Sequence, residues 1–385
     1  MSATSTNMTD GRLKREVQLH LKRLGFTRDK TGNLVPPKLD KDAYREMHLA
    51  QREERLEEES DFVSRAWRDV GHYFADGPEV IVDAIRVRLE QIHASTWQAD
   101  LFRLACLIWS VPVSRGYGRR LRFLVWDDSN GKLIGLFALG DPVFNLKARD
   151  TEIGWTGIDR VSRLVGILDA YVLGAVPPYS NLLGGKLVAC LIRSKEVAEL
   201  FKKYYQNTTG KISGRKKQAE LIAVTTTSAL GRSSIYNRLT LGGTKYFRPI
   251  GYTTGFGHFH FPERLFEQMR KHLERNNDKY ASNHSFGEGP NWRFRTIRRS
   301  LSRLGLPPAL LKHGLRREVF ICDLADNASQ VLRGSDKNPN YRTILNANEI
   351  GEQAIARWIK PRSLRDGSYL EVTRENILAR ITGKS

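Results

Sequence analysis

The sequence predicts a mixed α/β protein, with a helical N-terminal region, a central sheet-containing domain and a basic, largely helical C-terminal region. Three observations lead to this fold class. Apolar residues recur at helical spacing in residues 1–112, short apolar runs bounded by turn residues follow in 113–285, and arginines at helical spacing open 286–385. We take these three ranges as the expected domains.

The N-terminal region is expected to be all-helical. Residues 11–26 place four apolar side chains on one helical face, namely Leu13, Val17, Leu21 and Leu24. Asp10 can cap the start of this helix, and Gly25 can end it. Residues 40–75 predict one long or two shorter polar helices, and residues 79–110 predict two more.

The central domain begins with a predicted hairpin. Residues 121–128 and 132–141 are strand candidates, and the tripeptide SNG between them supplies a tight turn. A third strand is expected at the end of the apolar stretch 160–178. The remaining elements are expected in this order: a helix at 181–205, a strand at 219–227, a short helix at 228–241, and one or two strands in 244–261. This order predicts a mixed sheet with helices packed on it.

The charge of the chain predicts a polyanionic partner. The formal net charge is +20, and residues 201–300 alone carry 19 Lys and Arg against 6 Asp and Glu. Nucleic acid is the natural partner of such an excess, and we expect DNA. A solvated basic surface without a ligand is the alternative.

Composition also bears on location. The longest apolar run is too short for a membrane span, and the N-terminal residues lack the apolar middle of a secretory signal. Three cysteines lie far apart, which favours a reducing compartment over a disulfide framework or a structural zinc site. We therefore expect a cytoplasmic protein without a membrane partner.

The stretch TTTSALGRSSIYNRL, residues 225–239, predicts a strand that ends in hydroxyl groups and passes into a helix. The backbone N–H groups at such a helix start can bind an anion, with Arg232 as a clamp for a phosphate. Tyr236, one to two turns into the helix, is our candidate proton donor. The alternative is structural, because Ser228 is also an ordinary helix cap and Tyr236 an ordinary core residue.

A second candidate site lies at the start of the helix predicted for 181–205. Gly184 and Gly185 allow a ligand to approach the backbone closely, and Lys186 can face a phosphate. The motif GxxxxGK[ST] of nucleotide-binding loops is absent. The glycines can equally serve only to pack a strand against a helix.

A third candidate is a carboxylate pair in the loop 140–155. Asp141 and Asp150 share this loop with Asn145, Arg149 and Trp155, and together they can transfer protons or hold a metal. Turn formation and surface ion pairs are the alternative explanation.

The fourth candidate is a metal site in GHFHF, residues 257–261. In a strand, His258 and His260 lie on one face and can ligate one metal ion. A His-apolar-His strand with a nearby tyrosine nucleophile is the layout of rolling-circle nicking enzymes. Tyr204, Tyr205 or Tyr280 can supply the tyrosine, but the sequence shows no clear third ligand.

The fifth candidate is a basic helix in residues 289–305. Its nucleic-acid-binding residues are expected to be Trp292, Arg293, Arg295, Arg298, Arg299 and Arg303. Arginines suit phosphate contacts, and aromatic residues suit stacking on bases. A solvated helix face is the alternative.

Several long segments together resemble one known family. They are LRFLVWD, KLIGLFALGDPVFNL, RDTEIGW, AVPPYSNLLGGKL, VTTTSALGRSSIYNRL, PIGYTTGFGHFHF and GPNWRFRTIRRSL. These segments resemble the DruA family of the Druantia anti-phage defence system over roughly residues 114–330. The resemblance implies a role in prokaryotic defence or mobile DNA without implying a reaction.

A weaker, fold-level likeness is to acetyltransferases of the GCN-five-related type. In that family a hairpin precedes a splayed strand, and the following helix takes the pyrophosphate of coenzyme A at a Q/R-x-x-G-x-G/A loop. The matching run here is Asn181 to Lys186, which departs from that pattern at both ends. The likeness implies an acetyltransferase-like central domain and implies Tyr236 as its proton donor.

We expect a DNA-binding protein of a defence or mobile-element system, acting on phage or mobile DNA, with other proteins of the system as possible partners. One alternative is a metal-dependent DNA-nicking or strand-transfer enzyme with a tyrosine nucleophile. The other is an acyl- or group-transferase that uses the α/β core. The sequence does not identify a cofactor.

Overall fold

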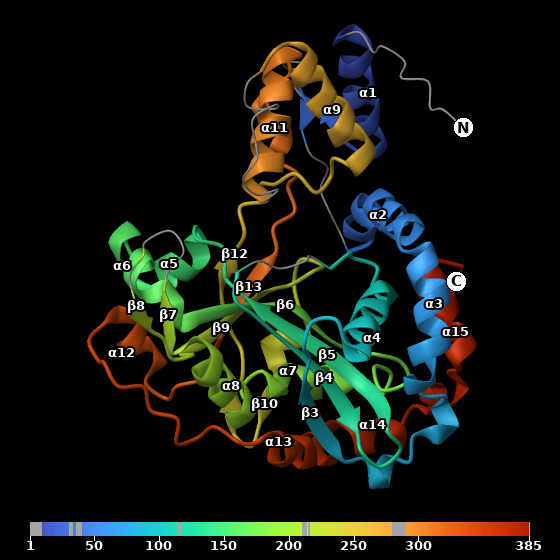
Figure 1. The fold of residues 1–385 in the computed structure, drawn as a ribbon, viewed down its shortest axis with the longest axis vertical. Coiled ribbons are helices and arrows are strands. Elements are labelled where there is room, and N and C mark those ends of the chain that lie inside the picture. Colours follow the sequence, from blue (N-terminus) through green and yellow to red (C-terminus); the bar gives the residue numbers. More distant parts are fainter. Residues whose placement is uncertain are drawn as a thin grey trace. The chain divides into compact units, whose positions relative to one another are not determined.

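A computed structural model describes residues 10–30, 34–35, 41–113, 118–209, 214, 216–278 and 290–384 (Figure 1). Close contacts divide the chain into two compact units, each built from two stretches of sequence. Unit 1 comprises residues 1–57 and 254–316, and unit 2 comprises residues 58–253 and 317–385. The contacts divide the chain at positions other than the ends of the three ranges expected from the sequence, and those ranges stay a prediction.

Unit 1 is mainly helical. Its elements are α1 (Asp10–Arg23), the short strands β1 (Thr27–Arg28) and β2 (Leu34–Val35), α2 (Lys41–Glu58), α9 (Glu263–Arg275), α11 (Pro290–Arg303) and the 3₁₀ helix η7 (Pro308–Leu311). The predicted first helix is confirmed, and it buries Leu13, Val17 and Leu21. α9 packs against both α1 and α11, so helices from the two stretches of sequence share one core.

A seven-stranded mixed sheet forms the centre of unit 2 (Figure 1). In spatial order its strands are β12 (Arg248–Tyr252), β13 (Glu318–Asp323), β9 (Ala223–Thr227), β6 (Ile167–Ala175), β5 (Lys132–Gly140), β4 (Arg120–Asp127) and β3 (Val87–Gln91). Neighbouring strands are antiparallel except for β6 and β9, which are parallel. The predicted mixed α/β class is therefore confirmed.

Helices cover both faces of this sheet. One face packs on α7 (Gly184–Leu191), α8 (Lys195–Tyr205), α13 (Ala347–Ala354) and the π-helix η8 (Ile355–Ile359), around buried residues such as Phe123, Phe137, Val188 and Phe320. The other face carries α5 (Lys147–Ile153), α12 (Ala328–Arg333) and a second cluster that includes Trp155 and Ile321. Unit 2 thus has a three-layer arrangement.

Smaller elements complete unit 2. The helices are α3 (Ser60–Val70), α4 (Trp97–Ala105), α6 (Gly157–Arg163), α14 (Lys360–Ser363) and α15 (Arg374–Thr382). Short 3₁₀ segments lie between elements, namely η1 (Gly71–Tyr73), η2 (Gly77–Glu79), η3 (Val82–Ala84), η4 (Cys106–Ile108), η5 (Leu164–Gly166), η6 (Tyr236–Arg238) and η9 (Gly367–Glu371). Two further strand pairs are β7 (Asn207–Thr209) with β8 (Lys216–Gln218), and β10 (Thr240–Leu241) with β11 (Thr244–Lys245). No helix among the described residues combines the length and the apolar character that crossing a membrane requires.

The hairpin predicted around SNG is confirmed as β4 and β5. Asp127 pairs with Lys132, and Gly131 adopts a φ of +68°, which a residue with a side chain rarely takes. Asp127 also accepts hydrogen bonds from the backbone and hydroxyl of Ser129. Local turn chemistry was therefore enough to find this pair of strands.

Two strands of the seven-stranded sheet were missed. The expectation that residues 1–112 are all-helical was wrong, because β3 pairs along its length with β4. Residues 286–385 also contain β13, which lies between β12 and β9 in the sheet. Both strands are short, and each is held by partners that are distant in sequence or outside its own predicted region.

The helices predicted after β6 also differ. The single helix expected at 181–205 is two, α7 and α8, which separate where Arg193 donates to the carbonyl oxygens of Asp323 and Thr343. The helix expected at 228–241 was wrong, since only η6 (Tyr236–Arg238) forms there. Residues 257–261 form turns rather than a strand.

Candidate functional site

The sheet of unit 2 opens between its two parallel strands. β6 and β9 pair over three residues only, ending at Asp169 and Thr225. β6 nevertheless continues to Ala175, where it is still paired with β5. The parallel strands therefore part beyond Asp169, and the β6 backbone on that side needs hydrogen-bond partners other than β9.

Hydroxyl groups of β9 bond to β6 at this opening. Thr225 Oγ1 donates to Oδ1 of Asp169 at 2.7 Å, and Thr226 Oγ1 donates to the carbonyl oxygen of Ala170 at 2.9 Å. Both threonines are buried. The hydroxyl run noted in the sequence thus belongs to the strand and bonds to β6 where the backbone ladder ends.

Asp169 is a partly buried carboxyl group at the opening. Burial raises its pKa to about 6, although the Thr225 hydrogen bond and the charge of Arg149 act in the opposite direction. Tyr171 follows two residues later on β6, and burial raises its pKa as well. A carboxyl group that titrates near pH 6 is suited to accept and return a proton. The sequence did not reveal it, because ILDAYVLGA shows only an apolar strand.

Both carboxylates of the predicted pair form ion pairs with arginine side chains. Asp150 is buried and contacts Arg149 and Arg160, each at 2.7 Å. The guanidinium of Arg149 is itself fully buried and also donates to two backbone carbonyl oxygens of the same loop. Asp141 accepts from the Nε and the backbone N–H of Arg119. These pairs fix the loop, and a catalytic role for either aspartate stays a prediction.

The segment after β9 is hydrogen-bonded to Glu318 of β13 and does not form the expected helix. The Ser228 N–H donates to the carbonyl oxygen of Glu318, and the Glu318 N–H donates to the carbonyl oxygen of Gly231, which has a φ of +76°. The buried Glu318 carboxylate accepts from the backbone of Ser233 and the side chain of Asn237. The expected helix start at Ser228 is therefore absent, and an anion site at this position stays a prediction.

Tyr236 lies in the core of this segment. Its ring packs against Phe247 and Phe320, with centroid separations of 4.8 and 5.3 Å, and burial raises its pKa to about 12. Such a group gives up its proton only at high pH. Arg232, four residues earlier, is exposed. The roles of Tyr236 as proton donor and of Arg232 as phosphate clamp stay predictions.

The predicted glycine pair and lysine begin α7, after the end of β6. A side chain at Gly184 would collide with the backbone, since an ideal Cβ there lies 2.6 Å from the carbonyl oxygen of Tyr179. Gly185 is open by comparison, with Ile235 as its nearest neighbour at 3.8 Å. Burial lowers the pKa of Lys186, and so do the charges of nearby arginines. Gly184 thus serves packing, and the roles of Gly185 and Lys186 in binding a ligand stay predictions.

His258 and His260 belong to unit 1 and lie in a turn, so the shared strand face expected for them is absent. His260 is buried and donates from Nε2 to the carbonyl oxygen of Leu310 at 2.9 Å. Burial lowers the pKa of His258 to about 4 and that of His260 to about 3.

The metal site built on these histidines stays a prediction. The described ranges contain no group of three or more His, Cys, Asp and Glu residues that could hold a metal ion. Of the candidate nucleophiles, Tyr204 and Tyr205 lie on α8 of unit 2, and Tyr280 falls outside the described residues.

The arginines of α11 fall into two groups. Arg293 bonds to Glu263 and lies over the ring of Phe266, while Arg299 and Arg303 both approach Asp278. Trp292 is half-buried against the same Phe266 ring. Arg295 and Arg298 are exposed, and the described part of the chain shows no ion pair for either. Within α11, Arg295 and Arg298 are thus the exposed guanidinium groups for which the described residues show no ion pair.

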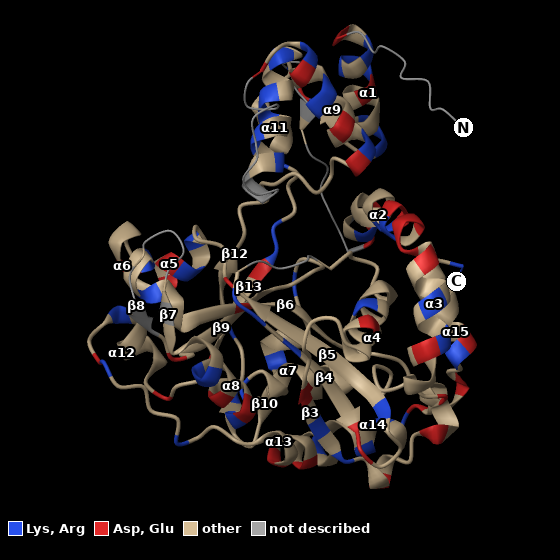
Figure 2. Ribbon diagram, viewed as in Figure 1, with Lys and Arg blue, Asp and Glu red and all other residues tan. Residues whose placement is uncertain are grey.

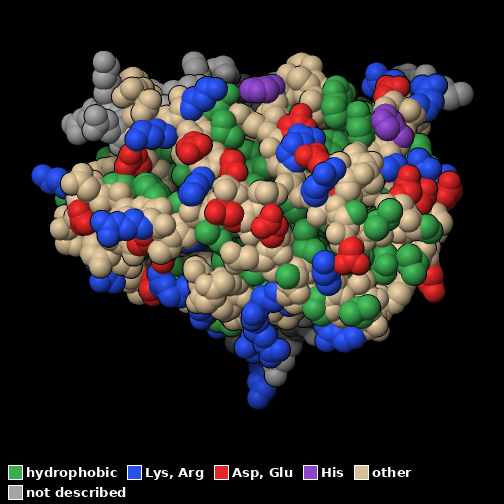
Figure 3. Space-filling model, turned by 90° about the horizontal axis from the view of Figure 1, so that it is seen from below, with side chains coloured by type: hydrophobic (Ala, Val, Ile, Leu, Met, Phe, Trp, Pro, Cys, Tyr) green, Lys and Arg blue, Asp and Glu red, His purple; other side chains and the backbone are tan. Residues whose placement is uncertain are grey.

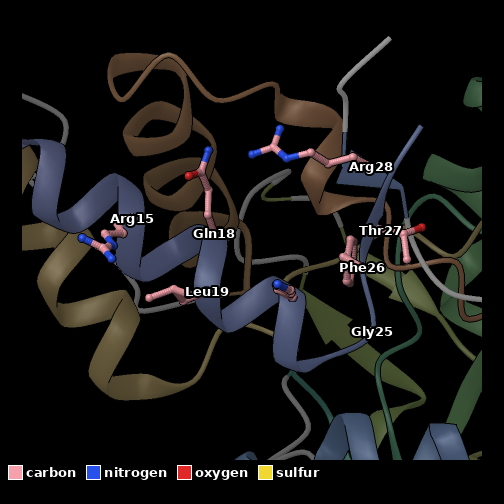
Figure 4. A pocket seen from close by; sticks show the side chains of 8 residues that line it. Arg15, Gln18, Leu19, Gly25, Phe26, Thr27 and Arg28 are labelled. Carbon is pink, nitrogen blue, oxygen red and sulfur yellow. The ribbon is translucent and has the colours of Figure 1, made fainter. Parts of the chain in front are cut away.

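A pocket that the sequence did not predict lies beside α1 in unit 1. It is lined by Arg15, Gln18, Leu19, Lys22, Gly25, Phe26, Thr27 and Arg28 (Figure 4). Its side chains combine positive charge with an exposed leucine and a buried phenylalanine ring. The spacing of Arg15 and Lys22, seven residues apart on one helix, was the available sequence signal.

The positive charge is denser in unit 1. Its 120 residues hold 24 Lys and Arg against 14 Asp and Glu, whereas the 265 residues of unit 2 hold 38 against 28. Figure 2 shows Lys and Arg along α1, α9 and α11, and an acidic stretch at the end of α2. Both units therefore carry a net charge of +10, but unit 1 has it on fewer than half as many residues.

The fold and these sites define a mixed α/β protein with a basic helical unit. A sequence model of the family described as Druantia protein DruA matches residues 38–334. The chain is 53% identical over 363 residues to the Druantia protein DruA of Escherichia coli strain UMEA 4076-1, covering 94% of this chain and 90% of that protein. The chain belongs to the DruA family, as its sequence segments predicted, and this membership indicates a role in anti-phage defence. No solved structure matches it.

Proposed function

We propose that this protein binds DNA through unit 1 as part of anti-phage defence, acting on phage or mobile DNA. The observation that carries the proposal is the pair Arg295 and Arg298 on α11, exposed and without an acidic partner among the described residues. Residues three apart on a helix share a face, so both guanidinium groups can reach one phosphate backbone.

The rest of unit 1 supports this proposal. The net charge of unit 1 is far denser than that of unit 2, and phosphate neutralisation with counterion release supplies most of the affinity of such surfaces. Arg293, Arg299 and Arg303 are held by acidic residues and instead shape α11 and its neighbours. Because the DruA family belongs to the Druantia system, other proteins of that system are the proposed protein partners.

A salt titration of DNA binding tests the proposal. The measurement is fluorescence anisotropy of labelled single- and double-stranded DNA between about 50 and 200 mM salt, the range over which counterion release changes the affinity strongly. The Arg295→Gln/Arg298→Gln variant is expected to bind about tenfold or more weakly. Its slope of log K against log salt should fall by about 2, since each lost phosphate contact removes about 0.9.

A matched control removes two exposed charges elsewhere. Lys337 and Arg342 are exposed in unit 2, and their replacement by Gln should leave DNA binding unchanged. An equal loss in this control would show that net charge alone governs binding. Absence of DNA binding by the unaltered protein at the lowest salt would remove the proposal altogether.

A second candidate function is group transfer by unit 2. The specific observation is the opening beyond Asp169 and Thr225, which follows the β4–β5 hairpin and precedes α7. This order agrees with the acetyltransferase likeness, in which a hairpin precedes a splayed strand and a helix follows. At such an opening Asp169 would accept a proton from the attacking group. Acyl transfer from acyl-coenzyme A to a panel of amines, lost in Asp169→Asn, is the expected result.

Nicking by a tyrosine nucleophile remains testable in the same samples. Labelled single strands incubated with Mg²⁺ or Mn²⁺ would be cut and covalently attached to the chain. The sequence motif for this activity involves His258 and His260, so loss of cleavage in the paired alanine variant with retained DNA binding is the outcome that supports it. A strand that stays intact with either ion excludes it.

A further inference from the structure

Positively charged side chains from separate elements of unit 2 gather around the first turn of α7. Lys186 belongs to α7, Arg238 ends η6, Arg357 belongs to η8, and Arg365 follows α14. The pKa of Lys186 is lowered first by burial and then by the charges of Arg357, Arg238 and Arg365. We call these four residues the Lys186 cluster.

Packing contacts independently bring these elements together. Lys186 Nζ lies 5.4 Å from the ring centroid of Trp358, which is the neighbour of Arg357 in η8. An ideal Cβ at Gly185 would lie 3.8 Å from Cδ1 of Ile235, three residues before Arg238. Segments far apart in sequence therefore converge on one small region.

The Lys186 cluster is without an ion-pair partner among the described residues. The described residues provide no ion pair for Lys186, Arg238 or Arg357, and both arginines are exposed. Adjacent cations differ in this respect. Lys360 pairs with Asp83, and Arg362 pairs with Asp366. Like charges held together without a counterion raise the free energy of the folded chain, and a bound anion would remove that cost.

We propose that the Lys186 cluster binds a small molecule that carries at least two linked phosphate groups. Guanidinium groups bind phosphate oxygens through paired hydrogen bonds, and the four positive charges match the two to four negative charges of a diphosphate or triphosphate. The open side of Gly185 leaves room beside the cluster. This inference concerns unit 2 and does not depend on DNA binding by unit 1.

A small ligand fits this place better than a nucleic-acid strand does. A strand requires a track of positive charge along its backbone. On the face of unit 2 that carries α13 and α14, Lys and Arg alternate with Asp and Glu side chains (Figure 3). The three arginines, by contrast, all act on one lysine. The compact arrangement therefore favours a ligand whose charges are close together.

Isothermal titration calorimetry on the full chain tests this proposal. The probes are inorganic pyrophosphate, ADP, ATP, coenzyme A, inorganic phosphate and a 20-nucleotide DNA strand, a length of order one protein footprint. Probes with linked phosphates are expected to bind, and inorganic phosphate at least tenfold more weakly. Preference for ADP and ATP identifies a nucleotide, whereas preference for coenzyme A identifies a nucleotide-derived cofactor.

Variants assign the binding to the cluster. Arg238→Gln and Arg357→Gln should each weaken pyrophosphate binding at least tenfold, and Arg342→Gln should leave it unchanged. Without ligand, the two cluster variants should melt at or above the temperature of the unaltered protein, because each removes like-charge repulsion. A merely structural role for these arginines would lower that temperature.

Three results would overturn the proposal: no binding of any linked-phosphate probe, equal binding in the cluster variants, or DNA as the only probe that requires Arg238 and Arg357. The last result would replace the small ligand with nucleic acid. The Arg295→Gln/Arg298→Gln variant should keep pyrophosphate binding. Failure of DNA binding by unit 1 is therefore distinguishable from failure of this site.

Discussion

Thr225 donates a hydrogen bond to Asp169 at the last paired position of β6 and β9. This contact marks the residue at which the parallel strands part. Burial raises the pKa of Asp169 from its ordinary 3.8 to about 6, even though the hydrogen bond favours the charged form. The carboxyl group at the opening is therefore costly to ionise, and its effect on stability must depend on pH.

The first prediction concerns this pH dependence. A carboxyl group whose pKa is raised by folding contributes stability below pH 3.8, and this contribution is lost as the pH rises through 6. The free energy of unfolding of unit 2 should fall by on the order of 3 kcal/mol across that window. Asp169→Asn keeps the acceptor for Thr225 and should abolish this slope in urea titrations at several pH values. An unchanged slope would contradict the prediction.

The second prediction is that the stability of unit 1 depends on pH in the opposite direction and falls as the pH is lowered. Burial holds the pKa of His258 at about 4 and that of His260 at about 3, below the ordinary 6.5. The unfolded chain therefore takes up protons first as the pH falls below 6.5, and the stability of unit 1 is lost progressively in that range. Hydrogen exchange at pH 7 and pH 5, corrected for the slower intrinsic exchange of free amides at pH 5, should show a lower free energy of opening for α1 and α9 at pH 5. An equal decrease in both units would argue against the histidines.

Arg149 should be essential to the fold of unit 2. Its guanidinium is fully buried and contacts Asp150, so Arg149→Met leaves a buried carboxylate with Arg160 as its remaining partner. Loss of one member of a buried ion pair costs about 3–5 kcal/mol. Arg163→Met, which breaks a more exposed pair with Asp159, should cost at most about 1 kcal/mol in the same urea titration. Equal costs would disprove the distinction.

Tyr236 should contribute to the stability of unit 2 mainly through the packing of its ring. The ring packs on Phe247 and Phe320, and the described residues provide no hydrogen bond to its hydroxyl. Tyr236→Phe should change the free energy of unfolding by less than about 1.5 kcal/mol, whereas Tyr236→Ala should cost about 3–5 kcal/mol. A large loss in the Phe variant would reveal a dependence on the hydroxyl. If group transfer occurs, a loss of activity in Tyr236→Phe without a loss of stability would support the predicted proton donor.

What the sequence predicted correctly was mostly local. The β4–β5 hairpin follows from the turn around Gly131, and α1 follows from the spacing of its apolar residues. β13 was missed because its partners, β12 and β9, lie more than sixty residues earlier in the chain. Local periodicity contains no information on such pairings. Ser228 was assigned as a helix cap for the same reason, since Glu318 on β13 is what holds that segment.

In the candidate sites, too, the features set by local sequence were predicted and those set by distant partners were not. The two glycines before it single out Lys186 in the sequence, but Arg238, Arg357 and Arg365 come near it only through folding. The basic face of α11 was predicted from its spacing, whereas the pairing of Arg299 with Asp278 depends on the packing of α11 beside the end of α9. Asp169 carries no signal in sequence, because its raised pKa arises from burial.

The division of unit 1 between residues 1–57 and 254–316 has a consequence during synthesis. At about 5–20 residues per second, α1 and α2 leave the ribosome on the order of ten seconds or more before α9 exists. The apolar face of α1 therefore lacks its packing partner α9 while every strand of the sheet except β13 is translated. A chaperone that shields Leu13, Val17 and Leu21 during that interval would raise the yield of active protein, and a ribosome stalled before residue 254 would display this face to solvent.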